Sequence, residues 1–444
     1  MIDITEYLNK DYSEAALYMN FRNTASYIDG LKNAARKTVF VVKKEHIGNE
    51  PIKVSAMGSK VVDKAEYLHG DTGIQSTIVT MNQAFTGKNN LPVMEAVGNF
   101  GTRFIPEASA ARYIFTRPQK YFNLIYRPED DCNLTGQEFE GKEIEPIFYV
   151  PTLPMILVNG TEGIGVGFAS TIYPRSIENM IKAIKAKIEG KNLKNDWFIP
   201  NWNGFIGKVY NKVDSWVVEG CCEFNNKKVH ITELPITENL VSYTKKILKV
   251  AKEKNYIQRF NDYSENDKFE FDVWLTDEEA KKSQEQIKKD LGLVTSMSEV
   301  FTCIDENNAI KEYKNAKDIF NDYYKIKIKY LKLRIKSEIT HLEKDKNEWA
   351  EIYKFINEVI KGTIDLKLKK AEVEKNLKEK GYTIIDKLLA MPLYSITKDK
   401  AAEIKQKLQD LKDQVDVMKN ETPESMWIKD LNELEKELKK EGKL

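Results

Sequence analysis

The sequence is poor in cysteine and in long apolar runs. It contains only Cys132, Cys221, Cys222 and Cys303, and no pair has the Cys-x-x-Cys spacing of a zinc site or redox motif. So few thiols favour a reducing, cytoplasmic compartment. The first residues lack a basic stretch followed by an apolar run, and no run approaches the roughly 18 apolar residues that span a bilayer. We therefore expect neither a signal peptide nor contact with a membrane.

An excess of one charge is also missing. The chain has 69 basic and 68 acidic residues, a net charge of +1, which taken alone argues against a nucleic-acid-binding protein. Residues 20–127, however, contain 15 basic and 8 acidic side chains, a local surplus of +7 that leaves −6 for the rest. The neutral total hides a basic N-terminal third, so nucleic-acid binding stays open.

Glycine and proline become scarce from residue 319 onward, where Lys and Glu dominate. A seven-residue spacing from Ile328 to Ile356 and a 3-4 spacing from Ala401 to Met418 predict long helices. Thr422-Pro423 predicts a cap and the first residue of a further helix. With a compact segment at about 359–394 between them, the helices indicate an antiparallel coiled-coil arm with a knob. A helical bundle packed on the core is the alternative.

The preceding two thirds show mixed patterns. Residues 12–145 combine short helices and strands with many glycines, whereas residues 146–315 are richer in strand patterns. Among the latter, Phe148–Val150 and Met155–Val158 are read as strands, and Asn225-Asn226 is read as a hairpin turn. Helices are expected near 177–189 and 238–255. The fold class is therefore α+β and multidomain, with predicted domains at 1–145, 146–318 and 319–444.

The pair Arg112-Tyr113 is a candidate for covalent chemistry. A guanidinium beside a phenol favours the phenolate, which is a competent nucleophile, and its planar fork of donors suits a phosphate. The small residues Ser109, Ala110 and Ala111 would let a ligand backbone approach closely. Because the chain has 21 tyrosines, a tyrosine that only packs in the core is the alternative.

Two turns precede predicted helices. Asp29–Lys32 opens a basic helix that carries Arg36 and Lys37, whose alternative reading is a solvated helix face. His69–Thr72 leads into an amphipathic helix that Asp71 or Thr72 could cap. A helix N-terminus attracts phosphate, to which His69 could donate a hydrogen bond. A turn histidine held by a structural partner is the alternative.

The glycine-rich segment Asn159–Gly167 follows a predicted strand. It fails the G-x-G-x-x-G pattern because Phe168 stands three positions after Gly165, and no lysine completes a Walker motif. A nucleotide-dependent enzyme built on this loop is thus disfavoured. The loop instead displays Ile164, which could be a core residue or a wedge between DNA base steps.

In this order and spacing, the motifs resemble the DNA-cleavage subunit of type IIA DNA topoisomerases over about residues 12–440. The resemblance is carried by Asp29–Lys32 with Arg36, His69–Asp71, Gly98–Gly101, Ala110–Tyr113, Asn159–Gly165, Ile231–Pro235 and Leu389–Thr397. Gly101–Arg103 and Tyr394–Thr397 are more similar to the eukaryotic and T-even bacteriophage branch than to gyrase. A separate chain of this size is similar to the medium subunit of the T-even-type phage enzymes.

The resemblance implies a winged-helix DNA-cleavage domain, a tower domain and a coiled-coil arm whose knob forms a dimer gate. Tyr113 would attack a DNA phosphate and become joined to the 5′ end. Residues that would position that phosphate or stabilise its charge are Arg112, Arg22, Lys32 and His69. Further DNA contacts would come from Arg36, Lys37, Arg103 and the wedge Ile164. Two positions match those that face intercalated quinolone-type drugs in relatives, Thr72 and Ser76.

The resemblance also implies partners. Neither a TOPRIM nor an ATPase domain can be matched, so Mg²⁺ and ATP would be bound by a separate ATPase/TOPRIM subunit. No metal site is expected in this chain. Double-stranded DNA and a second copy of the chain would be the other partners, for relaxation and decatenation. If phage-encoded, the protein would act in the host cytoplasm. A non-catalytic DNA-binding coiled-coil structural protein is the alternative.

Overall fold

The computed structural model describes residues 4–444, except for the side chains of Lys246 and Leu393. The chain forms two compact units: unit 1 holds the chain up to Lys327 together with Ile428–Leu444, and unit 2 holds Ile328–Trp427. Residues 428–444 thus belong to unit 1. The predicted domain bounds at 145 and 318 are not tested by this division and stay predictions. Within residues 4–444, no helix is both long and apolar enough to cross a membrane.

The N-terminal part of unit 1 packs helices on a small sheet. The helices are α1 (Ile4–Tyr7), a π-helical turn (Leu8–Tyr12), α2 (Ser13–Asn23), α3 (Asn33–Lys44), α4 (Val54–Lys64) and α5 (Asp71–Asn82). The strands are antiparallel in the order β1 (Ile52–Lys53), β3 (Phe115–Pro118), β2 (Met94–Val97). Apolar side chains at helical spacing on α3, α4 and α5 form the core, as Val41, Val61 and Ile78 are fully buried.

Short elements follow within unit 1. They are α6 (Phe122–Ile125), β4 (Gln137–Phe139), β5 (Lys142–Ile144), α7 (Met155–Asn159), β6 (Thr161–Ile164), β7 (Ala169–Ile172) and α8 (Ile177–Ile188). Met155–Val158, predicted to be a strand, is the helix α7. All four of its residues are buried, and a short run that is apolar on every side does not distinguish helix from strand. Phe148–Val150 is also outside any strand. The helix expected near 177–189 is confirmed.

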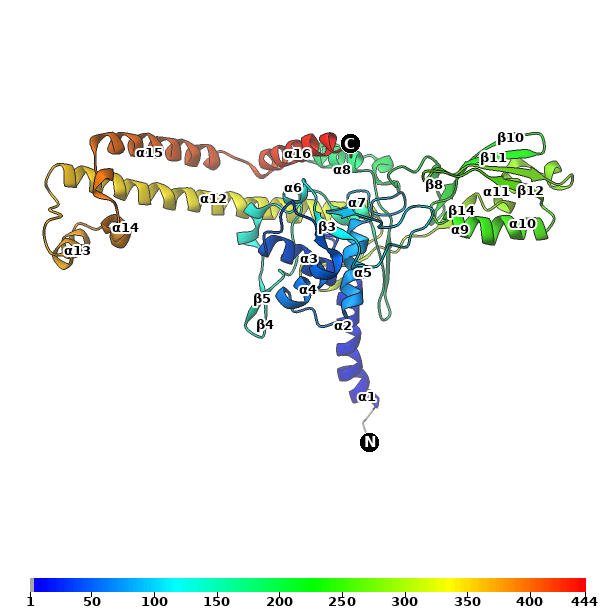
Figure 1. Cartoon of the computed structure of the whole chain (residues 1–444), viewed down its shortest axis with the longest axis horizontal. Coiled ribbons are helices and arrows are strands. Elements are labelled where there is room, and N and C mark those ends of the chain that lie inside the picture. Colours follow the sequence, from blue (N-terminus) through cyan, green and yellow to red (C-terminus); the bar gives the residue numbers. More distant parts are fainter. Residues whose placement is uncertain (1–3) are drawn as a thin grey trace. The chain divides into compact units, whose positions relative to one another are not determined.

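Two sheets dominate residues 208–297 of unit 1 (Figure 1). One has the order β14 (Val294–Met297), β9 (Ser215–Glu219), β8 (Lys208–Lys212), and the other β10 (Cys221–Asn225), β11 (Lys228–Glu233), β13 (Phe271–Leu275), β12 (Ile257–Asp262). The hairpin predicted at Asn225-Asn226 is confirmed, because Asn225 pairs with Lys228. The remaining elements here are α9 (Leu240–Ser242), a π-helical segment (Tyr243–Leu248), α10 (Lys249–Glu253), α11 (Gln284–Asp290), β15 (Thr302–Ile304) and β16 (Ile310–Glu312).

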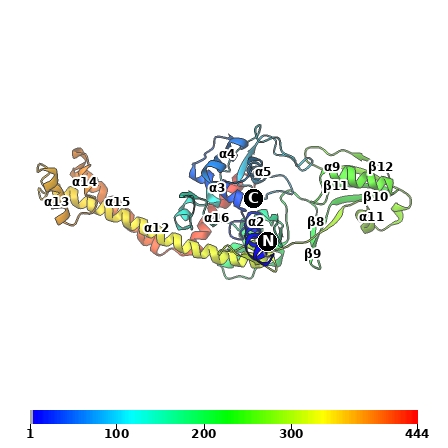
Figure 2. The same cartoon turned by 90° about the horizontal axis from the view of Figure 1, so that it is seen from below.

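Long helices characterise the last third of the chain. They are α12 (Ala316–Ile360), α13 (Lys370–Glu379), α14 (Ile385–Leu389), α15 (Lys398–Lys419) and α16 (Pro423–Lys440), and 3₁₀ helices occur at Pro128–Asn133, Asn195–Phe198, Glu279–Lys281 and Leu393–Ser395. In unit 2, Glu343 pairs with Lys419 at 2.7 Å, and the Lys407 ammonium lies 3.7 Å from the Trp349 ring centroid. Helices α12 and α15 are therefore antiparallel neighbours, with α13 and α14 near the end they share (Figure 2). The helices predicted from residue spacing are confirmed.

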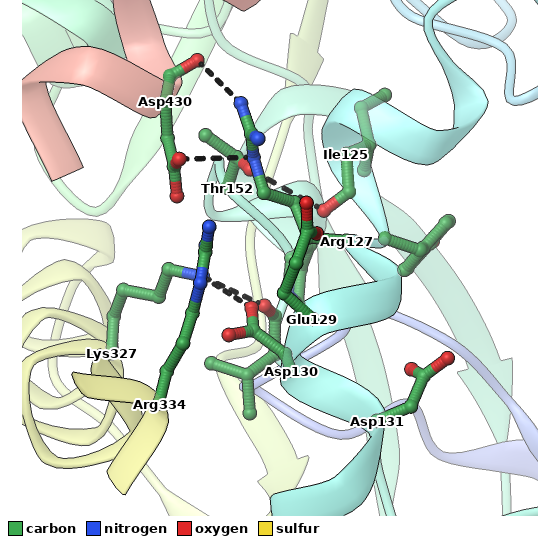
Figure 3. Close-up of polar contacts among 12 residues, drawn as sticks. Ile125, Arg127, Glu129, Asp130, Asp131, Thr152, Lys327, Arg334 and Asp430 are labelled. Atoms are coloured by element: carbon green, nitrogen blue, oxygen red, sulfur yellow. Dashed lines mark hydrogen bonds and ion pairs between the residues drawn. The ribbon is translucent and has the colours of Figure 1, made fainter. Parts of the chain in front are cut away.

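Residues 428–444 are held in unit 1 by burial and by ion pairs. Leu431, Leu434 and Leu438 are fully buried. Arg127 Nε lies 3.1 Å from a carboxylate oxygen of Asp430 (Figure 3). The start of α12 is fixed similarly, because the buried Lys327 ammonium lies 3.2 Å from an Asp130 carboxylate oxygen (Figure 3). The chain thus leaves unit 1 and returns to it at two anchored places.

Candidate functional site

Tyr113 lies on an exposed loop with a fixed backbone. The first two residues of α4 donate backbone hydrogen bonds to the carbonyls of Ile114, at 3.0 Å, and Ala111, at 3.2 Å. Ile114 is 1% exposed and anchors the loop, whereas Tyr113 is 66% exposed. The Arg112 guanidinium carbon lies 4.9 Å from the Tyr113 ring centroid. The loop therefore presents a phenol and a cation together to solvent.

The turn Gly98–Gly101 determines where this loop begins. Gly101 has φ +87°, and a Cβ there would lie 2.4 Å from the Pro106 carbonyl oxygen. The Asn99 side-chain oxygen accepts a hydrogen bond from the Gly101 amide at 2.9 Å, and the Asn99 backbone carbonyl accepts one from the Ser109 amide at 3.0 Å. Only glycine fits this conformation and this close approach. The motif thus shapes the segment that leads to Tyr113.

A cleft of about 580 Å³ lies among α2, α3, α5 and the segment Asn159–Glu162. Of the predicted site residues, Arg22, Lys32 and Ser76 line it. The Lys32 ammonium donates to the Glu162 carbonyl at 2.5 Å. Burial lowers the pKa of Lys32, and the Glu162 carboxylate opposes that effect. We call this feature the cationic cleft, because two side-chain cations on its wall suit a phosphate.

His69 lies beside Arg22 but does not line the cationic cleft. Its Nε2 is 2.6 Å from the Tyr18 hydroxyl, and its ring meets the Tyr67 ring edge-on with centroids 5.4 Å apart. The Arg22 guanidinium carbon lies 5.8 Å from the Tyr18 ring centroid. Burial, and then the charge of Arg22, lower the pKa of His69. Both effects favour the neutral imidazole form of His69.

Helix α5 begins differently from the prediction. Gly70 is its N-cap, and no side chain caps it, so the expected cap by Asp71 or Thr72 is wrong. Thr72 and Ser76 are both exposed on α5, and only Ser76 lines the cationic cleft. Their role as drug-facing positions stays a prediction.

Strands β6 and β7 form a hairpin, Thr161–Ile172, which we call the wedge hairpin. Ile164 pairs with Ala169 at the end of the ladder, and its side chain is 78% exposed. The alternative that Ile164 is a core residue is therefore wrong. The preceding element is the helix α7, so the glycine-rich segment runs from the end of a helix into the wedge hairpin.

The cations Arg36 and Lys37 are engaged inside the protein. Arg36 binds the fully buried Asp29 with Nε at 2.7 Å and Nη2 at 3.0 Å. The Lys37 ammonium lies 2.8 Å from a Glu145 carboxylate oxygen, and Lys37 is 7% exposed. A cation buried in an ion pair does not reach a DNA phosphate. The expectation that Arg36 and Lys37 contact DNA therefore disagrees with the structure, which makes them supports of α3.

Arg103 is likewise buried, and it joins two of the motifs. Its Nη2 lies 3.1 Å from a Glu233 carboxylate oxygen and donates to the Leu234 carbonyl at 3.0 Å. The guanidinium carbon lies 5.0 Å from the Phe269 ring centroid. Gly101–Arg103 and Ile231–Pro235, two of the motifs that carry the resemblance, are thus in contact with each other. The expected DNA contact of Arg103 also disagrees with this geometry.

Much of the basic surplus of residues 20–127 is paired with acids from elsewhere in unit 1. Carboxylates outside that range form ion pairs with Lys37, Lys43, Lys44, Arg103, Lys120 and Arg127. The local surplus therefore serves the packing of unit 1 as well as the cationic cleft. It is not a measure of a DNA-binding surface.

The sequence did not single out Tyr18 or Asn20, both on α2. Tyr18 contacts His69, 51 positions away, and Asn20 contacts Val166, 146 positions away. Contacts between such distant positions leave no spacing pattern in the sequence.

Comparisons with known proteins agree with the motifs. The family model for the A subunit of DNA gyrase/topoisomerase IV matches residues 22–432. The DNA topoisomerase 2 of Penicillium chrysogenum is 27% identical and covers 97% of this chain, with 30% of its own length matched. The mitochondrial DNA topoisomerase 2 of Dictyostelium discoideum is 28% identical and covers 100% of the chain, with 36% of its own length matched. The chain thus spans about a third of the length of these curated relatives.

A solved structure agrees with the fold. The DNA-binding, cleavage and re-ligation domain of Plasmodium falciparum topoisomerase II superposes with a TM-score of 0.88 at 27% identity. The match covers 98% of this chain and 64% of that structure's chain. Because the family model covers nearly the whole sequence, the chain belongs to the family of DNA gyrase/topoisomerase IV A subunits and corresponds to a type IIA topoisomerase cleavage subunit.

Proposed function

We propose that this chain breaks and rejoins DNA within an ATP-dependent type IIA topoisomerase, with Tyr113 as the nucleophile. The observation that carries the proposal is the 66% exposure of Tyr113 on a loop whose backbone is fixed at both flanks, with Arg112 at its ring. A nucleophile must be accessible and held in place, because a small displacement costs much of the rate.

The reaction exchanges one phosphodiester for another. The Tyr113 oxygen bonds to the DNA phosphorus, and the bond from phosphorus to the 3′ oxygen breaks. The phenol loses one proton, and the released 3′ oxygen gains one to become a 3′ hydroxyl. The 5′ phosphate remains on the tyrosine, so the reverse attack by the 3′ hydroxyl reseals the strand. Arg112, Arg22 and Lys32 stabilise the developing phosphate charge, and neutral His69 donates a hydrogen bond.

Bending of the cleaved DNA is the proposed role of Ile164. An apolar side chain inserted between base steps unstacks them and kinks the duplex. The 78% exposure of Ile164 at the end of a short hairpin supports this role, since an apolar residue gains little from contact with water. Ile164→Ala should therefore reduce bending and cleavage more than DNA binding.

The parts of the fold take the roles that the family implies. We assign α3, α4, α5 and the β1-β3-β2 sheet to a winged-helix cleavage domain, and the sheets of residues 208–297 to a tower domain. Helices α12 and α15 form a coiled-coil arm, and residues 359–394 form a gate between two copies of the chain. Exposed apolar side chains at Leu368, 47%, and Tyr394, 84%, support a gate surface. Deleting residues 359–394 should weaken the dimer in sedimentation.

Mg²⁺ and ATP are proposed to be bound by a separate ATPase/TOPRIM subunit. Within residues 4–444, no group of three or more His, Cys, Asp or Glu side chains could hold a metal ion. No step of the proposed reaction is routed through Mg²⁺. Relaxation and decatenation are the expected outcomes of strand passage. The phage origin and the cytoplasmic location stay predictions.

Trapping of the covalent intermediate tests the nucleophile. The chain is mixed with DNA, Mg²⁺ and a candidate ATPase/TOPRIM subunit. The reaction is then quenched with denaturant. We expect DNA to remain attached to the wild-type chain, and Tyr113→Phe to abolish the attachment with little change in DNA affinity. Tyr210→Phe is a matched control, because Tyr210 is also exposed but lies on β8.

The outcomes separate the proposal from its rival. If Tyr113→Phe still traps DNA covalently, another residue is the nucleophile. If the wild-type chain binds DNA but traps none with any partner, the non-catalytic DNA-binding structural protein is favoured. Trapping without a second subunit would contradict the proposed source of Mg²⁺.

A further inference from the structure

The buried side-chain amide of Asn20, on α2, pairs with the backbone hydrogen-bonding groups of Val166 in the turn of the wedge hairpin. The Asn20 Oδ1 accepts a hydrogen bond from the Val166 amide at 2.7 Å, and the Asn20 Nδ2 donates to the Val166 carbonyl at 3.2 Å. Asn20 is 3% exposed. Its side chain therefore pairs with Val166 as a neighbouring strand would, and joins two segments that are 146 positions apart.

The glycines of the hairpin fit closely against the same helix. A Cβ at Gly165 would lie 2.0 Å from the Asn20 Oδ1, and a Cβ at Gly163 would lie 2.1 Å from the Asn23 carbonyl oxygen. Neither glycine has a positive φ. Glycine is therefore needed at both positions because the backbone of the hairpin approaches α2, rather than for a special conformation.

The alternation of side chains along a strand explains what this contact does for Ile164. Successive residues of β6 point to opposite faces. With Gly163 and Gly165 against α2, the side chain between them points away from the helix, in agreement with its 78% exposure. The direction of the Ile164 side chain thus depends on the contacts that hold Gly163 and Gly165 against α2.

The same end of α2 carries a cation of the cleft. Arg22, two residues after Asn20, lines the cationic cleft, and Lys32 on the cleft wall donates to the Glu162 carbonyl at the base of the wedge hairpin. The hairpin is therefore bound at its turn by Asn20 and near its base by Lys32. Both contacts tie it to the elements that bear the phosphate-binding cations.

We infer that Asn20 is a positioning residue for the wedge. It fixes the wedge hairpin against α2, so that Ile164 enters the DNA at a set distance from the cations of the cleft. Bending and phosphate alignment are then coupled through one side chain that touches neither DNA nor the reacting atoms. This inference rests on the proposed function of Ile164.

A double-mutant cycle on the full chain tests the inference. DNA bending is measured by energy transfer across a duplex labelled at both ends, and cleavage by trapping with Mg²⁺ and the ATPase/TOPRIM subunit. We expect Asn20→Ala to lower the equilibrium constant for bending about tenfold, as loss of two hydrogen bonds allows. Ile164→Ala should lower the equilibrium constant for bending by a similar factor. The double variant should bend DNA little less than either single variant, because both substitutions disable the same wedge. DNA affinity should change little.

The matched control is Asn9→Ala, the same substitution at an exposed position of the N-terminal helical segment. It should bend DNA as the wild-type chain does. If Ile164→Ala lowers bending but Asn20→Ala does not, or if their effects multiply, the positioning role is refuted while the wedge stands. If Ile164→Ala bends DNA normally, the wedge itself is refuted, and the inference with it.

Gly165→Ala tests the contact from the other side and leaves Asn20 in place. Its methyl group would collide with the Asn20 side chain, so bending should fall as in Asn20→Ala. Truncating Asn20 makes room, since the next nearest atom outside that side chain is the Phe168 carbonyl oxygen at 3.5 Å. Asn20→Ala should therefore restore part of the thermal stability lost in Gly165→Ala. Additive losses of stability would overturn the contact as described.

Discussion

Replacing Arg103 tests most clearly whether a cation predicted to contact DNA instead stabilises the fold. Arg103→Met keeps the apolar stem beside Phe269 but removes the charge that faces Glu233. Both partners are about 5–7% exposed, and removing one member of a buried ion pair costs about 3–5 kcal/mol. Glu233 keeps the backbone donors of Leu234, at 2.9 Å, and Ile206, at 3.4 Å. We therefore expect the lower end, about 3 kcal/mol of the free energy of unfolding.

The loss should depend on pH. Burial raises the pKa of Glu233, and Arg103 opposes that rise. Without Arg103 the folded-state pKa moves higher still, so the folded variant binds a proton that the unfolded chain, with a pKa near about 4.3, releases. The variant therefore loses stability as pH rises through the window between the unfolded and folded pKa values. Its deficit should be larger at pH 8 than at pH 5.

Urea denaturation at both pH values measures the loss, and Arg259→Met is the control at an exposed arginine. The double variant Arg103→Met/Glu233→Gln should recover part of the stability, because no unpaired charge remains. A salt titration of DNA binding completes the test. A residue that contacts a phosphate contributes about one to the salt slope. A slope lowered by about one in Arg103→Met, with unchanged stability, would refute the structural role.

Three further predictions concern the site and unit 2. Arg22→Met removes a charge that lowers the pKa of His69, so that pKa should move up toward its usual value of about 6.5 in an NMR titration; an unchanged pKa would contradict the effect of Arg22 on His69. Gly101→Ala should cost about 1–3 kcal/mol, because its φ of +87° and the approach of the Pro106 carbonyl exclude a side chain. Gly101→Ala should also trap DNA more slowly. Unchanged thermal stability of this variant would contradict the strain expected at position 101. Thr422→Ala removes an N-cap bond of 3.1 Å to the Ser425 amide and should cost about 1 kcal/mol in thermal unfolding, whereas Thr422→Ser should not.

The sequence predicted the helices of unit 2 because their pattern is long and local. The seven-residue spacing from Ile328 to Ile356 lies within the single helix α12, and the stripe from Ala401 to Met418 lies within α15. A short buried run carries less information. Met155–Val158 is apolar on every side, so its helical state follows from the surrounding core rather than from its own pattern.

The sequence predicted the motifs of the candidate site, but not which of its basic side chains are paired with carboxylates. Tyr113 and Ile164 are exposed, as their proposed roles require. Whether a cation is free depends on carboxylates that the fold brings close, and Lys37 meets Glu145 across 108 positions. A count of local charge cannot reveal such pairs, which is why the basic surplus suggested more DNA contacts than the structure leaves free.

The return of the chain to unit 1 has a consequence for cleavage by proteases. A cut near Gly362, between α12 and α13, would produce two fragments, the second ending in Ile428–Leu444. That end stays anchored by buried leucines and by the pairs of Asp430 with Arg127 and Glu441 with Lys120. We expect the two fragments to elute as one particle in gel filtration and to separate only in denaturant. The covalent chain can thus be interrupted in unit 2 while the protein remains a single assembly.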